Sequence, residues 1–401
     1  MSDSKPAVLA AAILAFATAA QADSVSDWNA TALAATSVPP NSVLQSRVLA
    51  IVQGAVFDAA NAVERRYPPL GADVRAPLGA SLDAAVASAA HGVLVRLAPS
   101  QQAMLDAALA AALVKVPQGQ AKIDGINAGS EAAEKWIAQR AKDGADARAA
   151  FTLVAGPGRW QPTPPQYAPG ILPQWGAVTP FALKSSHQFD VKGPPAANSS
   201  AFARDLAEVR DVGARDSKTR TADQTAAAIF WTVQTPVVWN TAARAASAAR
   251  GLSALEGARV LALVNFACAD SQIAGFEVKY RMPHWRPITA IRQSGNVADA
   301  AWEPLLATPP HPEYPSAHAL CSGASEAVLK GYFGSDKVTA SVTFPPGFGV
   351  TRSWSSYSQI AQEVDGARIW GGIHFRTADA DGRDLGRRIG EFILEKFPAA
   401  R

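Results

Sequence analysis

Apolar residues recur at steps of three and four positions through most of the chain, which is the spacing of an amphipathic α-helix. Segment 42–66 shows this pattern most clearly and is bounded by proline pairs on both sides. The same spacing predicts helices over 82–97, 101–116, 123–142, 201–212, 222–232, 240–252, 256–280, 355–371 and 384–397, and another beginning near Ser316. Strand-like alternation is scarce, so the pattern predicts an all-α fold with long loops.

Two segments interrupt the helical pattern. Segment 156–195 contains nine prolines, which exclude a continuous helix, and aromatic residues that argue against a free linker. A second non-helical stretch is predicted over 283–315. The expected organisation is one globular unit made of an N-terminal helical region (23–155), a Pro-rich packed loop (156–200) and a helical core (201–401).

The first 22 residues have the features of an export signal peptide. Lys5 and the free amine supply positive charge, an apolar stretch follows over 7–20, and the triplet Ala20-Gln21-Ala22 is typical of a cleavage site. The apolar stretch is shorter than the ~20 residues of a membrane helix, and a retained anchor is the alternative. Charges interrupt every later apolar stretch, so we expect a secreted or periplasmic protein without a membrane span after signal removal.

Composition narrows the class of protein. Of the 401 residues, 48% are hydrophobic and 18% are charged, which excludes a disordered or fibrous protein. The net charge is +3 without a stripe of Lys and Arg, so nucleic-acid binding is not expected. Two cysteines are too few for a four-cysteine zinc site; after export, Cys268 and Cys321 either pair or stay buried and unpaired. A homo-oligomer is compatible with these features.

Residues suited to chemistry concentrate near the C-terminus, where four of the six histidines lie in the last 120 residues. Ser316 follows Pro315 at an expected helix N-cap, so the free N–H groups after it would form an anion site. Lys and Arg neutralise anionic oxygens, while His bonds a central atom or moves a proton. A site for a tetrahedral oxyanion is therefore predicted from Lys279, Arg286, Ser316, Ala317, His318, Arg368 and His374.

The same residues carry a resemblance to a known superfamily. Its signature is a Lys, six residues and Arg-Pro; then Pro-Ser-Gly-His; then Ser-Arg, five residues and His. The matching parts here are Lys279…Arg286-Pro287, Pro315-Ser316-Ala317-His318 and Ala367-Arg368…His374. The chain thus resembles the superfamily that joins vanadium-dependent haloperoxidases with type-2 phosphatidic acid phosphatases and bacterial acid phosphatases, and in particular its secreted bacterial haloperoxidase-like members. The resemblance extends from Val25 to the C-terminus and implies an all-α helical bundle.

The chain departs from this signature at a few positions. Ala replaces Gly at position 317 and Ser at position 367. Some members carry an Asp four residues after the last His, where this chain has Ala378, with Asp379 one position further. In metal sites a second residue normally accepts a hydrogen bond from the histidine ring and so fixes which ring nitrogen carries the proton. Ala378 cannot do this for His374, so another residue would have to. Two carboxylates near Lys279 are candidates for this role, namely Asp270 and Glu277.

The resemblance also implies what each residue would do. The three cations would hold the oxyanion, with hydrogen bonds from Ser316 and the Ala317 N–H. In a haloperoxidase His374 would bond the vanadium of a vanadate cofactor, hydrogen peroxide and halide would be the substrates, and His318 would assist proton transfer. His311 would either tune proton supply or lie at the surface. Phe276 would form an apolar wall or pack in the core.

Other functions are compatible with the same residues. In a periplasmic acid phosphatase His374 would form a phosphohistidine from a phosphate monoester, and His318 would protonate the leaving alcohol. An inactive oxyanion-binding protein is another alternative. A zinc site built from His311, His318 and His374 is disfavoured, because three nearby cations would repel Zn²⁺.

Overall fold

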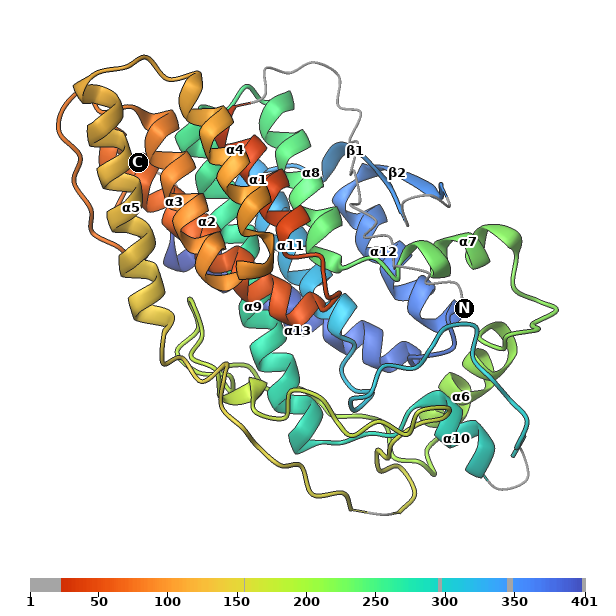
Figure 1. Cartoon of the computed structure of the whole chain (residues 1–401). Helices are drawn as coiled ribbons and strands as arrows, with labels where there is room; N and C mark the ends of the chain where they lie inside the picture. Colours follow the sequence, from red (N-terminus) through yellow and green to blue (C-terminus); the bar gives the residue numbers. More distant parts are fainter. Residues whose placement is uncertain (1–22, 155, 295–297, 345–348, 399–401) are drawn as a thin grey trace, which may run out of the picture.

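The structure is a computed structural model that describes residues 23–398 except 155, 295–297 and 345–348 (Figure 1). The expected signal peptide, 1–22, lies outside the described residues. Thirteen α-helices, two 3-10 turns and a two-stranded antiparallel sheet form within these limits, which confirms the all-α fold class. The helices are α1 (Ser24–Ala35), α2 (Ser42–Glu64), α3 (Leu82–Leu97), α4 (Gln102–Val114), α5 (Gln120–Arg140), α6 (Ser200–Val212), α7 (Ala222–Phe230), α8 (Thr235–Ala249), α9 (Ala254–Arg281), α10 (Pro287–Gln293), α11 (Ala317–Phe333), α12 (Tyr357–Trp370) and α13 (Arg376–Lys396).

Helix α9 is the central element of the core. It begins with a capping box between Ser253 and Glu256, and most of its residues are buried. Helices α2, α8, α11 and α13 all pack against it. Because buried residues lie on nearly every side of α9, neighbouring helices must cover all of its faces, which gives it the central position.

Glycines let α11 and α13 approach closely. A Cβ atom at Gly323 would lie 2.1 Å from the carbonyl oxygen of Arg383, and one at Gly386 would lie 2.1 Å from that of Leu320. Any side chain at either position would push the helices apart. This packing matters for function because the first turn of α11 carries the predicted Ser316–His318 segment.

One described helix, α2, is long and apolar enough to cross a membrane by length and composition. However, 83% of the most apolar 18-residue stretch of α2 is buried inside the protein. We interpret α2 as a core helix, whose apolar surface is covered by α3, α5 and α9.

Several expectations about secondary structure are wrong. Helix α1 has no counterpart among the expected helices, and α8 begins at Thr235 and not at 240. Helix α10 lies inside the stretch 283–315 that was expected to be non-helical, because Pro287 occupies the first turn, where proline favours a helix. Helix α13 begins at Arg376 and not at 384. An antiparallel hairpin of β1 (Lys337–Thr343) and β2 (Thr351–Ser356) was missed, although apolar residues alternate along β1 at Val338, Ala340 and Val342.

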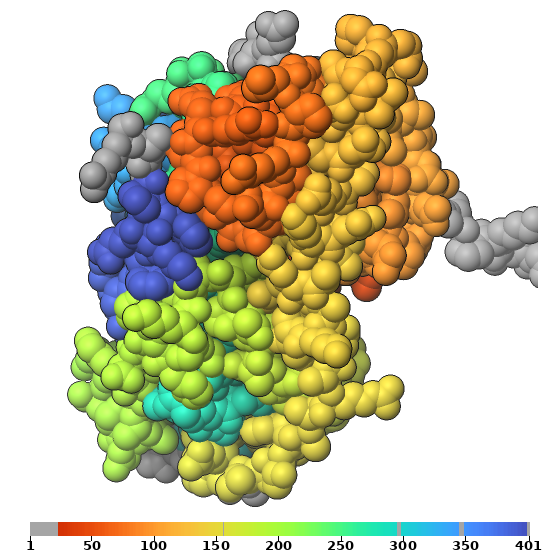
Figure 2. All heavy atoms as spheres, turned by 90° about the vertical axis from the view of Figure 1, so that its left-hand side faces the viewer, coloured from red at the N-terminus to blue at the C-terminus, as the bar shows by residue number. Residues whose placement is uncertain are grey.

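The Pro-rich segment packs against the helical body. Asp270, buried in α9, accepts hydrogen bonds from the backbone N–H groups of Phe181, Ala182 and Leu183 at 2.6, 2.8 and 2.8 Å. The Trp160 N–H donates to the carbonyl of Pro283 at 2.9 Å, and a 3-10 turn, η2 (Trp175–Ala177), also contacts α9. Figure 2 shows the yellow to light-green segment spread over the lower part of one face, around a teal patch from later in the chain.

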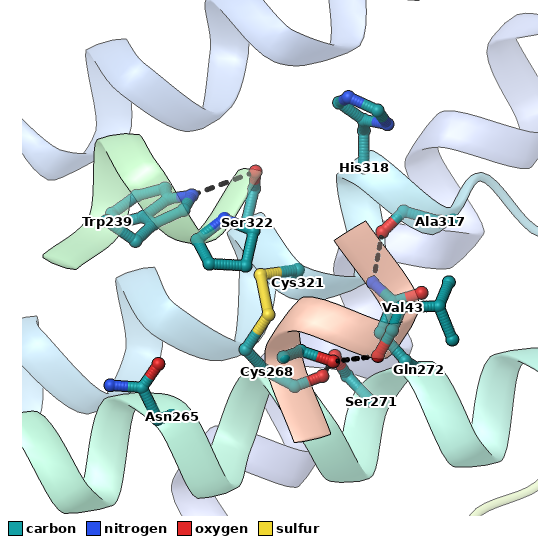
Figure 3. Close-up of a disulfide and its surroundings, with 12 residues drawn as sticks. Val43, Trp239, Asn265, Cys268, Ser271, Gln272, Ala317, His318, Cys321 and Ser322 are labelled. Carbon is teal, nitrogen blue, oxygen red and sulfur yellow. Dashed lines mark hydrogen bonds between the residues drawn. A yellow bond between two sulfur atoms is a disulfide. The ribbon is translucent and has the colours of Figure 1, made fainter. Parts of the chain in front are cut away.

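Cys268 of α9 and Cys321 of α11 form a disulfide, so of the two alternatives the structure has the paired one. The bond joins the helix that ends near Lys279 to the helix that begins after Ser316 (Figure 3). Beside it, Gln272 donates from Nε2 to the carbonyl of Ala317 at 2.8 Å. Both contacts fix α9 relative to the first turn of α11.

Removing the disulfide should therefore destabilise the fold. The two cysteines are 53 positions apart, and opening a loop of that size costs about 4 kcal/mol of unfolding free energy. The Cys268→Ala/Cys321→Ala double variant should show this loss in urea denaturation, and reduction of the unmodified protein should produce the same loss. Equal stability of oxidised, reduced and double-variant protein would contradict the structural role of the bond.

Candidate active site

The three predicted segments meet at one buried place. Lys279 lies at the end of α9, Arg286 precedes α10, Ser316 precedes α11, and Arg368 lies in the last turn of α12. His374 lies between α12 and α13. Lys279, Arg286 and Ser316 have no exposed surface, and the other two are almost fully buried.

Lys279 is held by backbone carbonyls of the segment before α11. Its Nζ donates to the carbonyl oxygens of Pro312 and Glu313 at 2.9 and 3.0 Å, and also to that of Pro315. An ammonium group has three donors, so all three have an acceptor here. Lys279 therefore contributes a positive charge and also fixes the backbone that precedes Ser316.

Arg286 connects two segments of the site. Its Nε donates to the carbonyl of His311 at 3.0 Å, and its Nη1 donates to the carbonyl of Ile373 at 2.8 Å. The same Nη1 lies 3.1 Å from Nε2 of His374, and Nη2 lies 3.1 Å from Nδ1 of His311. The guanidinium thus joins the loop before α11 to the loop before α13.

Arg368 and Ser316 have open donors. Arg368 donates from Nη1 to the carbonyl of Trp231 at 2.6 Å, but its buried Nε has no partner among the described residues. The buried Oγ of Ser316 makes no cap bond to α11 and lies beside the carboxylate of Asp379, without meeting strict hydrogen-bond geometry. The first i→i−4 bond of α11 runs from the Leu320 N–H to the Ser316 carbonyl, so the preceding amides of that turn are also unpaired within the helix.

His374 has a hydrogen-bonding partner on each side of its ring. Nδ1 lies 2.8 Å from Oε1 of Glu313, and Nε2 faces Arg286. Oε1 of Glu313 also accepts the Phe375 N–H at 3.0 Å. Burial, followed by Arg286 and Lys279, lowers the pKa of His374 well below its usual value. We therefore describe the Glu313 contact as a hydrogen bond from a neutral imidazole and not as an ion pair.

His318 and His311 flank this arrangement. His318 is half-buried, and its Nε2 lies 3.3 Å from the carbonyl of Val233, next to the Trp231 carbonyl that binds Arg368. His311 is buried, which excludes the surface alternative, and its ring centroid lies 5.4 Å from that of Phe276. Phe276 is itself buried among core residues, so it both packs in the core and contacts the site.

Burial and like charge determine the electrostatics of the site. Burial, and then Arg286, lowers the pKa of Lys279 well below its usual value. Burial lowers the pKa of Arg286 and of Arg368 to about 10. It raises the pKa of Glu313 to about 7. The site is thus a buried concentration of positive charge, which favours an anionic ligand.

Two features of the site were missed by sequence reasoning. Glu313 lies two residues before Pro315, the first residue of the second signature segment, but no spacing rule shows that its carboxylate reaches His374. The turn between α7 and α8 supplies the carbonyls of Trp231 and Val233, and backbone acceptors carry no sequence signal.

The carboxylates that were considered for orienting His374 have other partners. Asp270 binds the Pro-rich segment, and Glu277 binds Arg281 on the same helix, so both predictions are wrong. Asp379 is buried beside the Ser316 hydroxyl, and neither of its oxygens makes a hydrogen bond of strict geometry to another described residue. Burial, and then Asp365, raises its pKa well above the usual value. The carboxylate that contacts the ring is that of Glu313.

No group of three or more His, Cys, Asp or Glu side chains within the described part of the chain is placed to hold a metal cation. The arrangement of His311, His318 and His374 thus offers no zinc site. The donors are suited to an oxyanion.

Comparisons with known proteins agree with this geometry. The family model of the VCPO second helical-bundle domain matches residues 259–400. The vanadium chloroperoxidase of Curvularia inaequalis is 34% identical over 88 residues, which span 19% of this chain and 14% of that protein.

Solved structures match over most of the chain. The crystal structure titled the first bacterial vanadium-dependent iodoperoxidase has a TM-score of 0.79 and 28% identity, and the match covers 94% of this chain and 96% of that one. A holo-type bacterial vanadium-dependent chloroperoxidase has a TM-score of 0.76 at 20% identity, covering 89% and 92%, which shows a shared fold.

The buried positive charge predicts how the site histidines titrate. Burial and neighbouring cations lower the pKa values of His311, His318 and His374, so the neutral rings should persist on acidification well below pH 6.5, where an unperturbed imidazole gains its proton. Ring NMR signals of the ligand-free protein, followed from pH 8 to pH 5.5, should stay those of neutral imidazole. Protonation of any of the three with a midpoint at or above 6.5 would contradict the electrostatics described here.

Proposed function

Because the chain belongs to the superfamily of vanadium-dependent haloperoxidases and related phosphatases, we propose that it is a vanadate-dependent haloperoxidase that oxidises a halide with hydrogen peroxide. The observation that carries the proposal is the set of open donors beside His374. The buried Nε of Arg368 lacks a partner within the described residues, the Ser316 hydroxyl has only the neighbouring Asp379 carboxylate beside it, and the first-turn amides of α11 lie next to Ser316. An unpaired buried donor is costly unless a ligand satisfies it.

These residues fit vanadate in charge and in hydrogen-bonding type. Arg368, Ser316 and the Ala317 N–H would donate hydrogen bonds to the vanadate oxygens. Lys279 and Arg286 would supply positive charge near the anion. His374 would bond the metal through Nε2. When bound, vanadate supplies a Lewis acid that activates peroxide toward attack by halide.

The remaining histidines of the site, His318 and His311, would take part in proton transfer. His318 is half-buried, so its ring can exchange a proton with a peroxide oxygen and with solvent. His311 is held against Arg286 and Phe276, where it would tune that proton supply. Both rings are neutral in the absence of ligand, which suits a group that must accept a proton.

The relatives favour a haloperoxidase over a phosphatase. The matched proteins are named vanadium chloroperoxidase and vanadium-dependent iodoperoxidase, and the latter match spans nearly the whole chain. Their halides differ, so the halide of this protein is part of the test. Export through residues 1–22, to a secreted or periplasmic site, belongs to the same proposal.

The activity assay separates the alternatives. Protein loaded with orthovanadate should halogenate a phenolic reporter dye in the presence of peroxide with iodide, bromide or chloride, and protein without vanadate should not. Hydrolysis of p-nitrophenyl phosphate without vanadate-dependent halide oxidation would instead indicate a phosphatase. Phosphate binding with neither activity would indicate an inactive oxyanion-binding protein.

Replacing Arg368 tests the open-donor assignment. Arg368→Ala removes a charge-assisted contact worth roughly 1.5–3 kcal/mol, so orthovanadate affinity measured by calorimetry should fall about 10- to 150-fold. Arg215, an exposed arginine paired with Glu303, offers a matched control, and Arg215→Ala should bind as the unmodified protein does. Unchanged affinity in Arg368→Ala would show that this residue does not contact the ligand.

A further inference from the structure

Each ring nitrogen of His374 has a different kind of partner. Nη1 of Arg286, 3.1 Å from Nε2, belongs to a guanidinium, which has donors and no acceptor. Nε2 must therefore present its lone pair. A neutral imidazole carries one proton, so that proton is on Nδ1, where it points at Oε1 of Glu313 at 2.8 Å.

Glu313 is fixed before any ligand binds. Its N–H donates to the carbonyl of His284 at 3.0 Å, and its own carbonyl accepts from Lys279. Its Oε1 also accepts the N–H of Phe375, the residue after His374. The carboxylate is thus tied to both segments that it joins, and it has no exposed surface.

We propose that Glu313 is the positioning residue of His374: by accepting the Nδ1–H, it holds the ring in the tautomer whose Nε2 lone pair faces the oxyanion site. The inference rests on the proposed function for the identity of the ligand. The tautomer itself rests on the contacts alone. Glu313 thereby takes the role that position 378, an alanine here, cannot fill.

The first experiment is a direct reading of the tautomer. Protein labelled with ¹⁵N-histidine, with His374→Ala used to assign the signal, should show His374 protonated at Nδ1 and unprotonated at Nε2. A ring protonated at Nε2 in the unmodified protein would overturn the proposal, whatever the enzyme activity.

The second experiment separates the acceptor from the bulk of the side chain. Glu313→Gln replaces the carboxylate with an amide whose oxygen can still accept the Phe375 N–H and the Nδ1–H, so it should retain the tautomer and lose orthovanadate and phosphate affinity by only a few fold. Glu313→Leu has no acceptor for the Nδ1–H, so that only Arg286 still favours the original tautomer; the other tautomer should become partly populated, and affinity should fall about 10- to 100-fold. Glu277→Gln, which removes a carboxylate bound to Arg281 outside the site, should behave as the unmodified protein.

The outcomes for Glu313 and for the proposed function are distinguishable. A folded Glu313→Leu variant that keeps the original tautomer and affinity would overturn the positioning role, even if the enzyme oxidises halides. The expected tautomer with phosphate binding but no halide oxidation would support that role and overturn the proposed function. If Glu313→Leu does not fold, the spectra of the unmodified protein and of Glu313→Gln decide.

Discussion

The site depends on the burial of three cations in the protein interior. Removing Lys279, Arg286 and Arg368 from water is costly, and the cost must be offset by groups that accept hydrogen bonds. Backbone carbonyls supply these acceptors. The His311 and Ile373 carbonyls bind Arg286, and the Trp231 carbonyl binds Arg368. Lys279 is bound by the carbonyls of Pro312, Glu313 and Pro315. The path of the loops around the helical core is therefore determined by where these carbonyls must point.

The helical body holds those loops in place from outside. Asp270 in the middle of α9 binds three consecutive amides of the Pro-rich segment, while the end of the same helix presents Lys279 to the site. The disulfide and the close α11–α13 packing fix the helix that begins after Ser316. Helix α9 thus connects the Pro-rich segment to the buried cations of the site.

Sequence reasoning recovered the parts that leave a periodic or spaced signal. Most of the helices follow from apolar spacing, and the convergence of the cations with His374 follows from side-chain chemistry together with the resemblance. Glu313 could not be assigned, because its function depends on a loop bringing it to a histidine 61 positions away. Proximity in sequence to Lys279 pointed instead to Asp270 and Glu277, whose side chains lie on α9 and bind elsewhere. Helix α10 was missed because it is only seven residues long and lies inside a stretch that was expected to be non-helical throughout, although Pro287 suits the first turn of a helix.

The carbonyls that surround the cations also bear on how such a protein diverges over evolutionary time. A main-chain oxygen is present whatever side chain its residue carries, so the segments that neutralise Lys279 and Arg286 are free to exchange most of their amino acids as long as the loop keeps its path. The side chains that cannot be exchanged are then the few cations and histidines of the site, together with whatever keeps the path of the backbone. A relative with only 28% identical residues accordingly superposes with a TM-score of 0.79.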